Sequence, residues 1–220
     1  ESWSVHGGGF YHVQKYAVAP EALPDDLHWF KYEAYFTWLS GFALLIVLYY
    51  FGANTYLIDS TRADLTPTMA IGISVAFLIG SWGLYEALCR SPIGRSTTVL
   101  ASSVLVLILV SAFLLTQIFS DRAAFLHVGA LIGTIMSANV FVVIIPNQKK
   151  VVADLLEKKL PDPSLGAHAR QRSLHNNYLT LPVLLLMVSA HYPLLFSGGA
   201  AWGWLVVGFI IVIGAIVRHF

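Results

Sequence analysis

Charge and cysteine are the scarce components of this sequence, and each scarcity excludes classes of protein. Only 11% of the 220 residues are charged, against roughly 25% in an ordinary soluble domain. Thirteen Lys and Arg nearly balance twelve Asp and Glu, so no basic field is present that would bind nucleic acid. Cys89 is the single cysteine, which excludes a disulfide framework, a cysteine-rich zinc site and haem attachment through a C-x-x-C-H motif. A soluble enzyme, a disordered protein and a DNA-binding module are therefore excluded.

Long uncharged runs take the place of the missing charges, since hydrophobic residues make up 57% of the chain. Four runs, at 34–58, 65–85, 96–120 and 123–148, each fit one membrane-spanning helix of about 20 residues. A fifth run, 173–217, is about twice that length and contains Pro193 and a Ser-Gly-Gly turn at 197–199, where the chain can fold back. The sequence therefore predicts an all-α, polytopic transmembrane bundle of six helices, at about 34–57, 66–88, 97–119, 123–145, 176–195 and 201–218.

Lys and Arg divide unevenly between the two sides of such a bundle. Eleven lie on the side of the N-terminal tail, and only Arg62 and Arg122 lie on the other. By the positive-inside rule, we expect residues 1–33 and a loop at about 146–175 to be cytoplasmic, with residues 34–220 as the transmembrane domain. Within that loop, residues 151–160 show helical periodicity. They predict a short helix in the membrane interface, or alternatively a partner-docking helix.

Two histidines fall at membrane depth, where ionisable groups are costly and usually functional. His127 lies about one turn into the fourth predicted helix, and His191 lies about one turn before the end of the fifth. Both belong to the outer third of the membrane, so the pair predicts the two axial ligands of a haem b iron. The alternative is a pair of histidines that hydrogen-bond backbone carbonyls.

A different polar population gathers at the inner ends of the predicted helices. It comprises Glu86, Asn139, Gln148, His175, Asn176 and Asn177. Amides and imidazoles near aromatic rings suit a planar, polar heterocycle, which they bind by edge hydrogen bonds and stacking. The alternative is helix capping by the asparagines and interfacial anchoring by the aromatic residues.

The N-terminal tail carries a glycine turn, Gly7-Gly8-Gly9, between His6 and Phe10. It lacks the G-x-x-x-x-G-K-[ST] pattern of a phosphate loop. Because glycine permits close approach of the backbone, the turn could line a ligand site together with its flanking ring side chains. Alternatively, it is an ordered turn that lies on the lipid headgroups.

Several strings together resemble one family, the membrane-bound, cytochrome c-linked urate oxidases of bacteria. They cover the chain from the tail to the last helix: HGGGFYHVQK at 6–15, HWFKYEAY at 28–35, NVF at 139–141, IPNQK at 145–149, PDP at 161–163, QRSLHNNYLTLP at 171–182 and SAHYP at 189–193. The resemblance implies an eight-helix protein of the bacterial inner membrane that oxidises urate to 5-hydroxyisourate. It also implies that electrons pass to a fused cytochrome c outside the membrane rather than to oxygen. One helix before this chain, and one helix and the haem c domain after it, are expected in a longer protein or a partner.

The residues and the resemblance together give one hypothesis for the site. His175 and Glu86 are the candidate bases, and the candidate substrate-binding residues are Asn176, Asn177, Asn139, Gln148, His6, Gly8 and Phe10. Haem b on His127 and His191 would carry electrons across the bilayer toward cytochrome c. Two rivals stay open: a non-catalytic haem-binding subunit of a respiratory assembly, and a cofactor-free transporter, for which the sequence shows no convincing repeat. Whether the protein forms a homo-oligomer or joins a respiratory complex is also left open.

Overall fold

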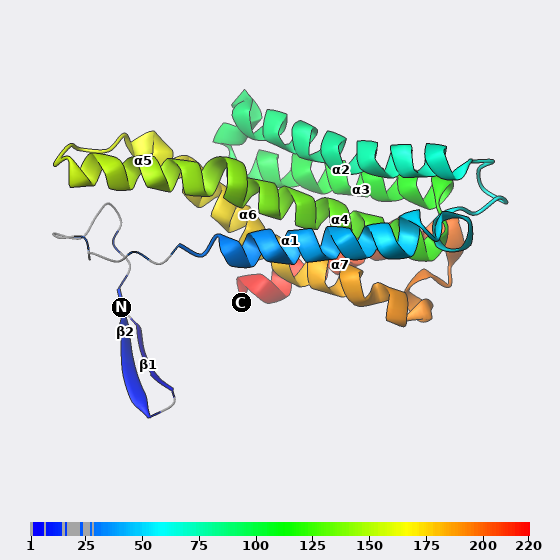
Figure 1. Ribbon diagram of the computed structural model, residues 1–220, viewed down its shortest axis with the longest axis horizontal. Helices are drawn as coiled ribbons and strands as arrows, with labels where there is room; N and C mark the ends of the chain where they lie inside the picture. Colours follow the sequence, from blue (N-terminus) through cyan, green and yellow to red (C-terminus); the bar gives the residue numbers. More distant parts are fainter. Residues whose placement is uncertain (1, 7, 15, 17–22, 24–26, 28) are drawn as a thin grey trace.

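Helices form almost all of the chain that the structure describes, which comprises residues 2–6, 8–14, 16, 23, 27 and 29–220. In this computed structural model the helices run lengthwise beside one another (Figure 1), which confirms the predicted all-α bundle. The α-helices are α1 Tyr32–Leu45, α2 Pro67–Arg90, α3 Thr97–Ile118, α4 Asp121–Ala138, α5 Ile145–Leu156, α6 Pro163–Val188 and α7 Gly199–His219. The π-helical turns are η1 Ile46–Tyr50, η2 Ala53–Leu57 and η4 Asn139–Ile144, and the 3₁₀ turns are η3 Pro92–Arg95, η5 Ser189–His191 and η6 Pro193–Phe196.

Among the described residues, five helical segments are long and apolar enough to cross a membrane. They are Tyr32–Tyr50, Pro67–Arg90, Thr97–Ile118, Asp121–Leu156 and Gly199–His219, and they suit a multi-pass membrane protein. The sixth predicted span, 176–195, is not among them. The first part of that stretch belongs to α6, which already begins at Pro163 and ends at Val188, and the rest falls in η5 and η6. The polar first half of α6 lowers its hydropathy, and the helix packs inside the bundle against α4 and α7.

The fourth span is much longer than predicted. α4, η4 and α5 form one helical segment of 36 residues, Asp121–Leu156, which at 1.5 Å per residue is about 54 Å long. Figure 1 shows its α5 part reaching beyond the end of α2. The helix predicted at 151–160 is present as far as Leu156, but it is the last part of α5 and continues the fourth span rather than forming a short helix. Most of the predicted loop at 146–175 is helix as well, and residues 157–162 make the connection between α5 and α6.

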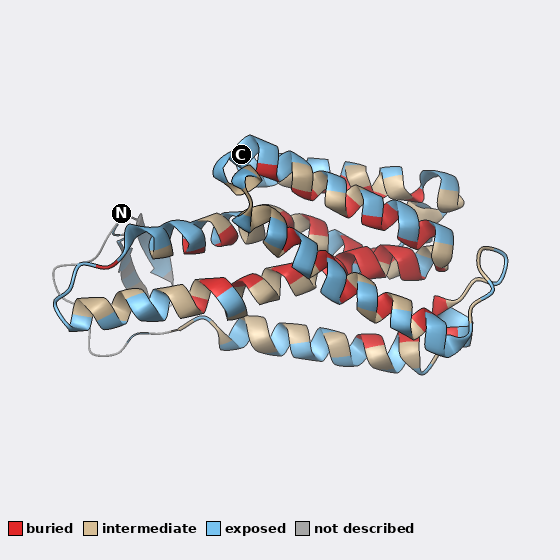
Figure 2. Ribbon diagram, turned by 90° about the horizontal axis from the view of Figure 1, so that it is seen from above, coloured by how far each residue is buried: buried red, intermediate tan, exposed pale blue. Residues whose placement is uncertain are grey.

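The core lies where α4 meets its neighbours, and Figure 2 shows the buried residues along the facing sides of the helices. Leu131 and Ile135 of α4, Ile108 of α3 and Leu186 of α6 are fully buried. Close contact between α6 and α7 depends on Gly214, because a Cβ atom there would lie only 2.8 Å from the Pro182 ring. Small residues allow such close approach of helices in a membrane, where packing rather than hydrophobic burial drives association.

One end of the bundle is closed by Arg62, in the loop between α1 and α2. Its Nη1 donates to the Thr116 and Phe119 carbonyl oxygens at 2.8 and 2.9 Å. Its Nη2 and Nε pair with Asp121 and Asp59 at 2.7 and 3.1 Å. We call these five residues the Arg62 clasp. The clasp joins the α1–α2 loop to the α3–α4 loop. The end of the bundle at which α5 lies is called the α5 end, and the clasp lies at the opposite end (Figure 1).

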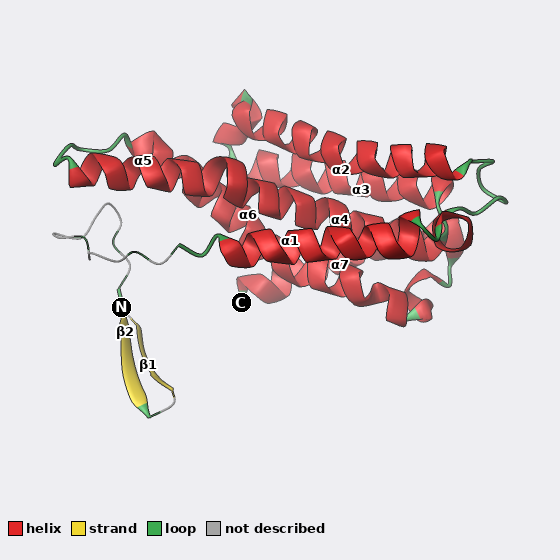
Figure 3. Ribbon diagram, in the orientation of Figure 1, coloured by secondary structure: helices red, strands yellow, loops and turns green. Residues whose placement is uncertain are grey.

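A two-stranded antiparallel hairpin precedes the helices (Figure 3). β1 Ser2–His6 pairs with β2 Gly9–Val13, and the register aligns Ser2 with Val13. Gly8 in the turn has a φ of 81°, a conformation that glycine adopts at little cost. The hairpin stands apart from the helical bundle (Figure 1).

Candidate functional site

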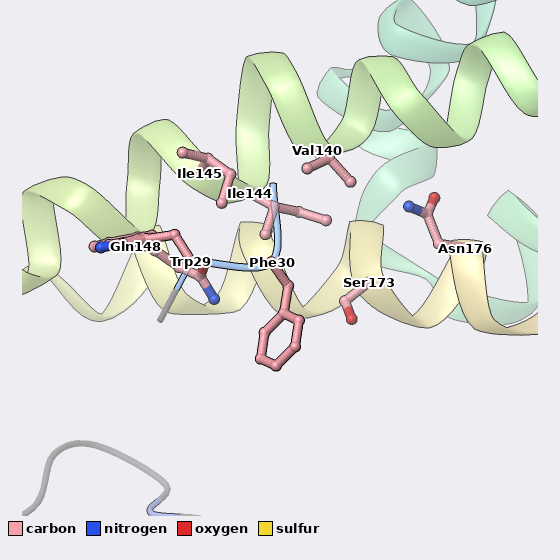
Figure 4. A pocket seen from close by; sticks show the side chains of 8 residues that line it. All are labelled: Trp29, Phe30, Val140, Ile144, Ile145, Gln148, Ser173 and Asn176. Atoms are coloured by element: carbon pink, nitrogen blue, oxygen red, sulfur yellow. The ribbon is translucent and has the colours of Figure 1, made fainter. Parts of the chain in front are cut away.

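A pocket of about 350 Å³ opens at the α5 end, between α6 and the helical segment that contains η4 and α5. Its volume falls in the range of small-molecule sites. Figure 4 shows its lining residues, which are Trp29, Phe30, Val140, Ile144, Ile145, Gln148, Ser173 and Asn176. Aliphatic and aromatic groups form most of the wall, and two amides and a hydroxyl supply hydrogen bonds. This combination suits a planar heterocycle with polar edges.

The π-helical turn η4 builds both the pocket and the polar layer behind it. It opens at Asn139 and spans Asn139–Ile144, so it contributes Val140 and Ile144 to the pocket wall. A π turn inserts an extra residue into a helix and is found frequently at functional sites. The run Val140–Ile144 contains four β-branched residues, which lose side-chain freedom in a regular α-helix.

Behind the pocket, the Asn139 side chain joins two others, those of Asn176 and Tyr85. It is 1% exposed, and its Nδ2 donates to the Asn176 Oδ1 at 2.9 Å and to the Tyr85 Oη at 3.1 Å. The Asn176 Nδ2 in turn donates to the Met136 carbonyl oxygen at 2.9 Å. Asn176 therefore lines the pocket on one side and fixes the buried layer on the other.

The Tyr85 hydroxyl also lies 2.7 Å from the His175 Nδ1. Because this hydroxyl already accepts a bond from Asn139, its single hydrogen is available for His175. An imidazole that accepts at Nδ1 carries its hydrogen on Nε2. The arrangement thus favours a neutral His175 that can take up a proton through Tyr85.

Glu86 lies between two arginines next to this pair. Its Oε2 accepts from the Arg172 Nη2 at 2.8 Å, and its Oε1 accepts from the Arg90 Nε at 2.6 Å. The Arg172 side chain is only 5% exposed, whereas the Arg90 side chain is 72% exposed. The Arg172 guanidinium carbon also lies 5.1 Å from the centroid of the Tyr85 ring. A carboxylate bonded by two guanidinium groups is better suited to hold Arg172 than to remove a proton.

The structure brings together only some of the predicted substrate-binding residues. Asn176 and Gln148 line the pocket, and Asn139 and His175 lie in the layer behind it. Asn177 does not line the pocket. Its Oδ1 instead accepts a hydrogen bond from the Arg218 Nε of α7 at 2.8 Å.

The three predicted residues of the tail are not brought to the pocket. Gly8 and Phe10 belong to the separate hairpin, where the Phe10 ring is exposed. His6 ends β1, and its side chain lies outside the described part of the structure.

Sequence reasoning missed Tyr85, Arg172 and the pocket residues Trp29 and Phe30. Arg172 lies in a stretch that the hydropathy pattern assigns to a loop, so its charge was attributed to the solvated inner side. Its spacing of three from His175 and four from Asn176 was the available signal, since such residues share one face of a helix.

The two predicted haem ligands, as they are arranged, do not fit a haem. His127 is 1% exposed, its Nδ1 donates to the Ala123 carbonyl oxygen at 2.7 Å, and its Nε2 lies 2.8 Å from the Ser74 hydroxyl. The rings of Tyr49 and Phe119 pack on the imidazole, while His191 is exposed on η5. Both nitrogens of His127 are engaged in a closely packed site. Haem b stays a prediction, and no chemical step is assigned to it.

Comparison with known proteins identifies a family for the chain, although no individual protein among those compared matches it. Among curated proteins and among solved structures, no match to the chain was found. The family described as urate oxidase N-terminal matches residues 1–220. This match confirms the resemblance to urate oxidases and supports a urate-related function, in agreement with a pocket that suits a planar heterocycle. Because the match covers every residue, the chain belongs to the urate oxidase N-terminal family.

Proposed function

We propose that this chain is the membrane part of an enzyme that oxidises urate to 5-hydroxyisourate and passes the electrons to cytochrome c. The observation that carries the proposal is the position of the pocket. Its amide wall, Asn176 and Gln148, is joined through Asn139 to the Tyr85–His175 pair. Hydrogen-bonding groups for a purine edge and a proton acceptor thus lie next to each other, in a chain of the urate oxidase N-terminal family.

The reaction fixes what the site has to do. Urate and one water molecule give 5-hydroxyisourate, two protons and two electrons. The amides of Asn176 and Gln148 bind the carbonyl and N–H edges of the ring, and the aromatic residues Trp29 and Phe30 cover the ring face. One of the two protons that the reaction releases passes to the Tyr85 oxygen as the hydroxyl hydrogen moves to the His175 Nδ1, which is general base catalysis through a relay.

The orientation of the protein follows from its charges. The sequence assigns eleven of thirteen Lys and Arg to the side that corresponds to the α5 end, so in our proposal this end faces the cytoplasm of a bacterial cell. Urate would enter the pocket from the cytoplasm, and cytochrome c, as a fused domain or a partner, would receive electrons at the opposite face. The electrons have to cross a hydrocarbon layer of about 30 Å.

Anaerobic reduction of cytochrome c tests the proposal. Purified protein, with urate and ferricytochrome c under argon, is expected to reduce two cytochromes for each urate consumed, with 5-hydroxyisourate as the product. Urate consumption that requires oxygen would overturn the electron acceptor. A protein with a haem spectrum that urate does not reduce would favour the non-catalytic haem-binding subunit.

A further inference from the structure

Arg172 is a buried cation whose hydrogen-bonding capacity is only partly used. Its Nη2 is bonded to Glu86, but its Nε and Nη1 are buried without any partner in the described part of the chain. The Asn139 Oδ1 is likewise buried and without a partner there. Two donors and one acceptor are therefore unpaired in the same polar layer.

Unpaired groups of this kind are costly, which makes their presence informative. A buried donor without an acceptor loses the hydrogen bonds that it makes with water, and the cost is greater for a charged group. Glu86 alone does not explain the arginine, because an ammonium group would satisfy that carboxylate equally well. A guanidinium adds a rigid, planar set of donors that matches oxyanions in two-point contacts.

Arg172 does not itself line the pocket, but it lies on the same helix as Asn176, which does. Arg172 and Asn176 are four residues apart on α6 and so share one face of the helix. Asn176 lines the pocket and bonds to Asn139. Glu86 and the Tyr85 ring hold the guanidinium in place.

We propose that Arg172 is the anion-recognition residue of this site. Its Nε and Nη1 donate to the oxygen-bearing edge of a planar oxopurine monoanion, and the Asn139 Oδ1 accepts from a ring N–H. Glu86 is then a positioning residue that acts through Arg172. This inference rests on the proposed function and deepens it: the site selects the anionic form of its substrate over a neutral purine of similar size.

Equilibrium binding to the purified protein in lipid nanodiscs tests this inference without any redox readout. The probes are radiolabelled urate and radiolabelled xanthine at slightly acidic pH, where urate is a monoanion and xanthine is mostly neutral. Arg172→Gln is expected to weaken urate binding by about 100-fold and Arg172→Lys by about 10-fold, because lysine keeps the charge but loses the planar donors. Xanthine binding should change by less than about threefold in both variants.

Arg90→Gln is the matched control. Arg90 bonds to the same carboxylate as Arg172 but is mostly exposed, so its loss should leave urate binding within about twofold. Glu86→Gln should weaken urate binding and leave xanthine binding unchanged, which a purely structural role would not produce. Thermal melting of each variant establishes that it is folded. If Arg172→Gln does not fold, the Arg172→Lys result decides.

The outcomes separate this inference from the proposed function. Wild-type urate affinity in folded Arg172→Gln or Arg172→Lys overturns the role of Arg172, whether or not the protein oxidises urate. Equal losses of urate and xanthine binding also overturn it, because they indicate general damage to the pocket. Binding of urate through Arg172 without oxidation supports the inference and overturns only the proposed reaction.

Discussion

Asn176 and Asn177 are adjacent in α6 and yet have different surroundings. Asn176 bonds to Asn139 and to the Met136 carbonyl oxygen, whereas Asn177 is bonded by Arg218. Helix capping, the alternative role for Asn176, is wrong. The residue lies inside α6, whose N-cap is Asp162, and Asp162 accepts from the Ser164 backbone nitrogen.

Asn176→Ala is expected to lower kcat/KM for urate by roughly ten- to a hundredfold. The substitution removes an amide of the pocket wall and leaves the Asn139 Nδ2 with one partner fewer, and each unmatched buried group costs about 1–3 kcal/mol. Steady-state kinetics with cytochrome c measure the effect. Asn177→Ala is the control and should stay within about twofold of the wild type. Equal effects of the two substitutions would contradict the assignment of the pocket wall.

Tyr85→Phe tests the proton relay. The variant keeps the buried ring and removes the hydroxyl that bonds to His175 and Asn139. We expect kcat to fall by about 10²-fold, with urate affinity changed far less, because general base catalysis contributes about 10²–10⁴-fold. Tyr50→Phe is the matched control, since its hydroxyl bonds to Ser74 away from the pocket. An unchanged kcat in folded Tyr85→Phe would remove Tyr85 from the mechanism.

About half of the candidate site could be predicted from the sequence. Asn139, Gln148, His175 and Asn176 stand out because polar residues are conspicuous beside apolar runs. Arg172 was not predicted, because an arginine next to a predicted membrane boundary looks like an ordinary positive-inside charge. Four predicted residues have side chains or backbone suited to the site but lie elsewhere: His6, Gly8, Phe10 and Asn177. Their positions depend on tertiary contacts, which the periodicity of the sequence does not reveal.

Elements away from the pocket determine the stability of the bundle, and the Arg62 clasp is the clearest of them. Arg62→Ala leaves Asp121 and two carbonyl groups without their partner. Because the Arg62 side chain is only 16% exposed, we expect a loss of about 1–3 kcal/mol in the free energy of unfolding. Thermal melting in detergent measures it. Lys159→Ala breaks the exposed Lys159–Glu157 pair and should change stability little. A similar Tm for both variants would contradict the role of the clasp.

Asp59 of the same clasp should make the stability of the protein depend on pH in the acidic range. A hydrogen bond from the Thr61 hydroxyl, assisted by Arg62, lowers the pKa of Asp59. A carboxyl whose pKa is lower in the folded state stabilises the protein above its unfolded pKa of about 3.9, and this contribution is lost as the pH falls through the folded value. Melting of the wild type and of Asp59→Asn at neutral pH and below pH about 3 measures the effect. The difference in Tm should shrink in acid, and a constant difference would contradict the assignment.

Most helix bounds were predictable, and the exceptions have physical reasons. The predicted helix at 97–119 corresponds to α3, Thr97–Ile118, because the charged residues Arg95 and Asp121 bound an uncharged run. The bounds of α5 and α6 were not predictable from hydropathy, since both helices continue into polar sequence where helix–helix packing supports them. The π turn at Asn139 gives no periodic signal in a segment that is apolar on all sides.

The orientation of the whole bundle in the membrane determines whether the pocket opens to the cytoplasm or to the outside. In a background with Cys89 replaced by serine, Cys introduced at Lys159 should be protected from an impermeant maleimide in intact cells. Cys introduced at Ser197 should react, because the sequence assigns only two of the thirteen Lys and Arg to that side. Permeabilised cells serve as the control for reactivity of both positions. The reverse labelling pattern would place the pocket on the outside.

The central claim is that urate is oxidised at the α5 end while its electrons leave at the other end. Inside-out membrane vesicles with ferricytochrome c trapped in the lumen test it most directly, because added urate then meets only the cytoplasmic face. We expect the trapped cytochrome to be reduced, with two molecules reduced for each urate consumed. In the Arg172→Gln variant this reduction should be abolished at low urate. Trapped cytochrome that stays oxidised while urate is consumed, or consumption only in right-side-out vesicles, would contradict the account.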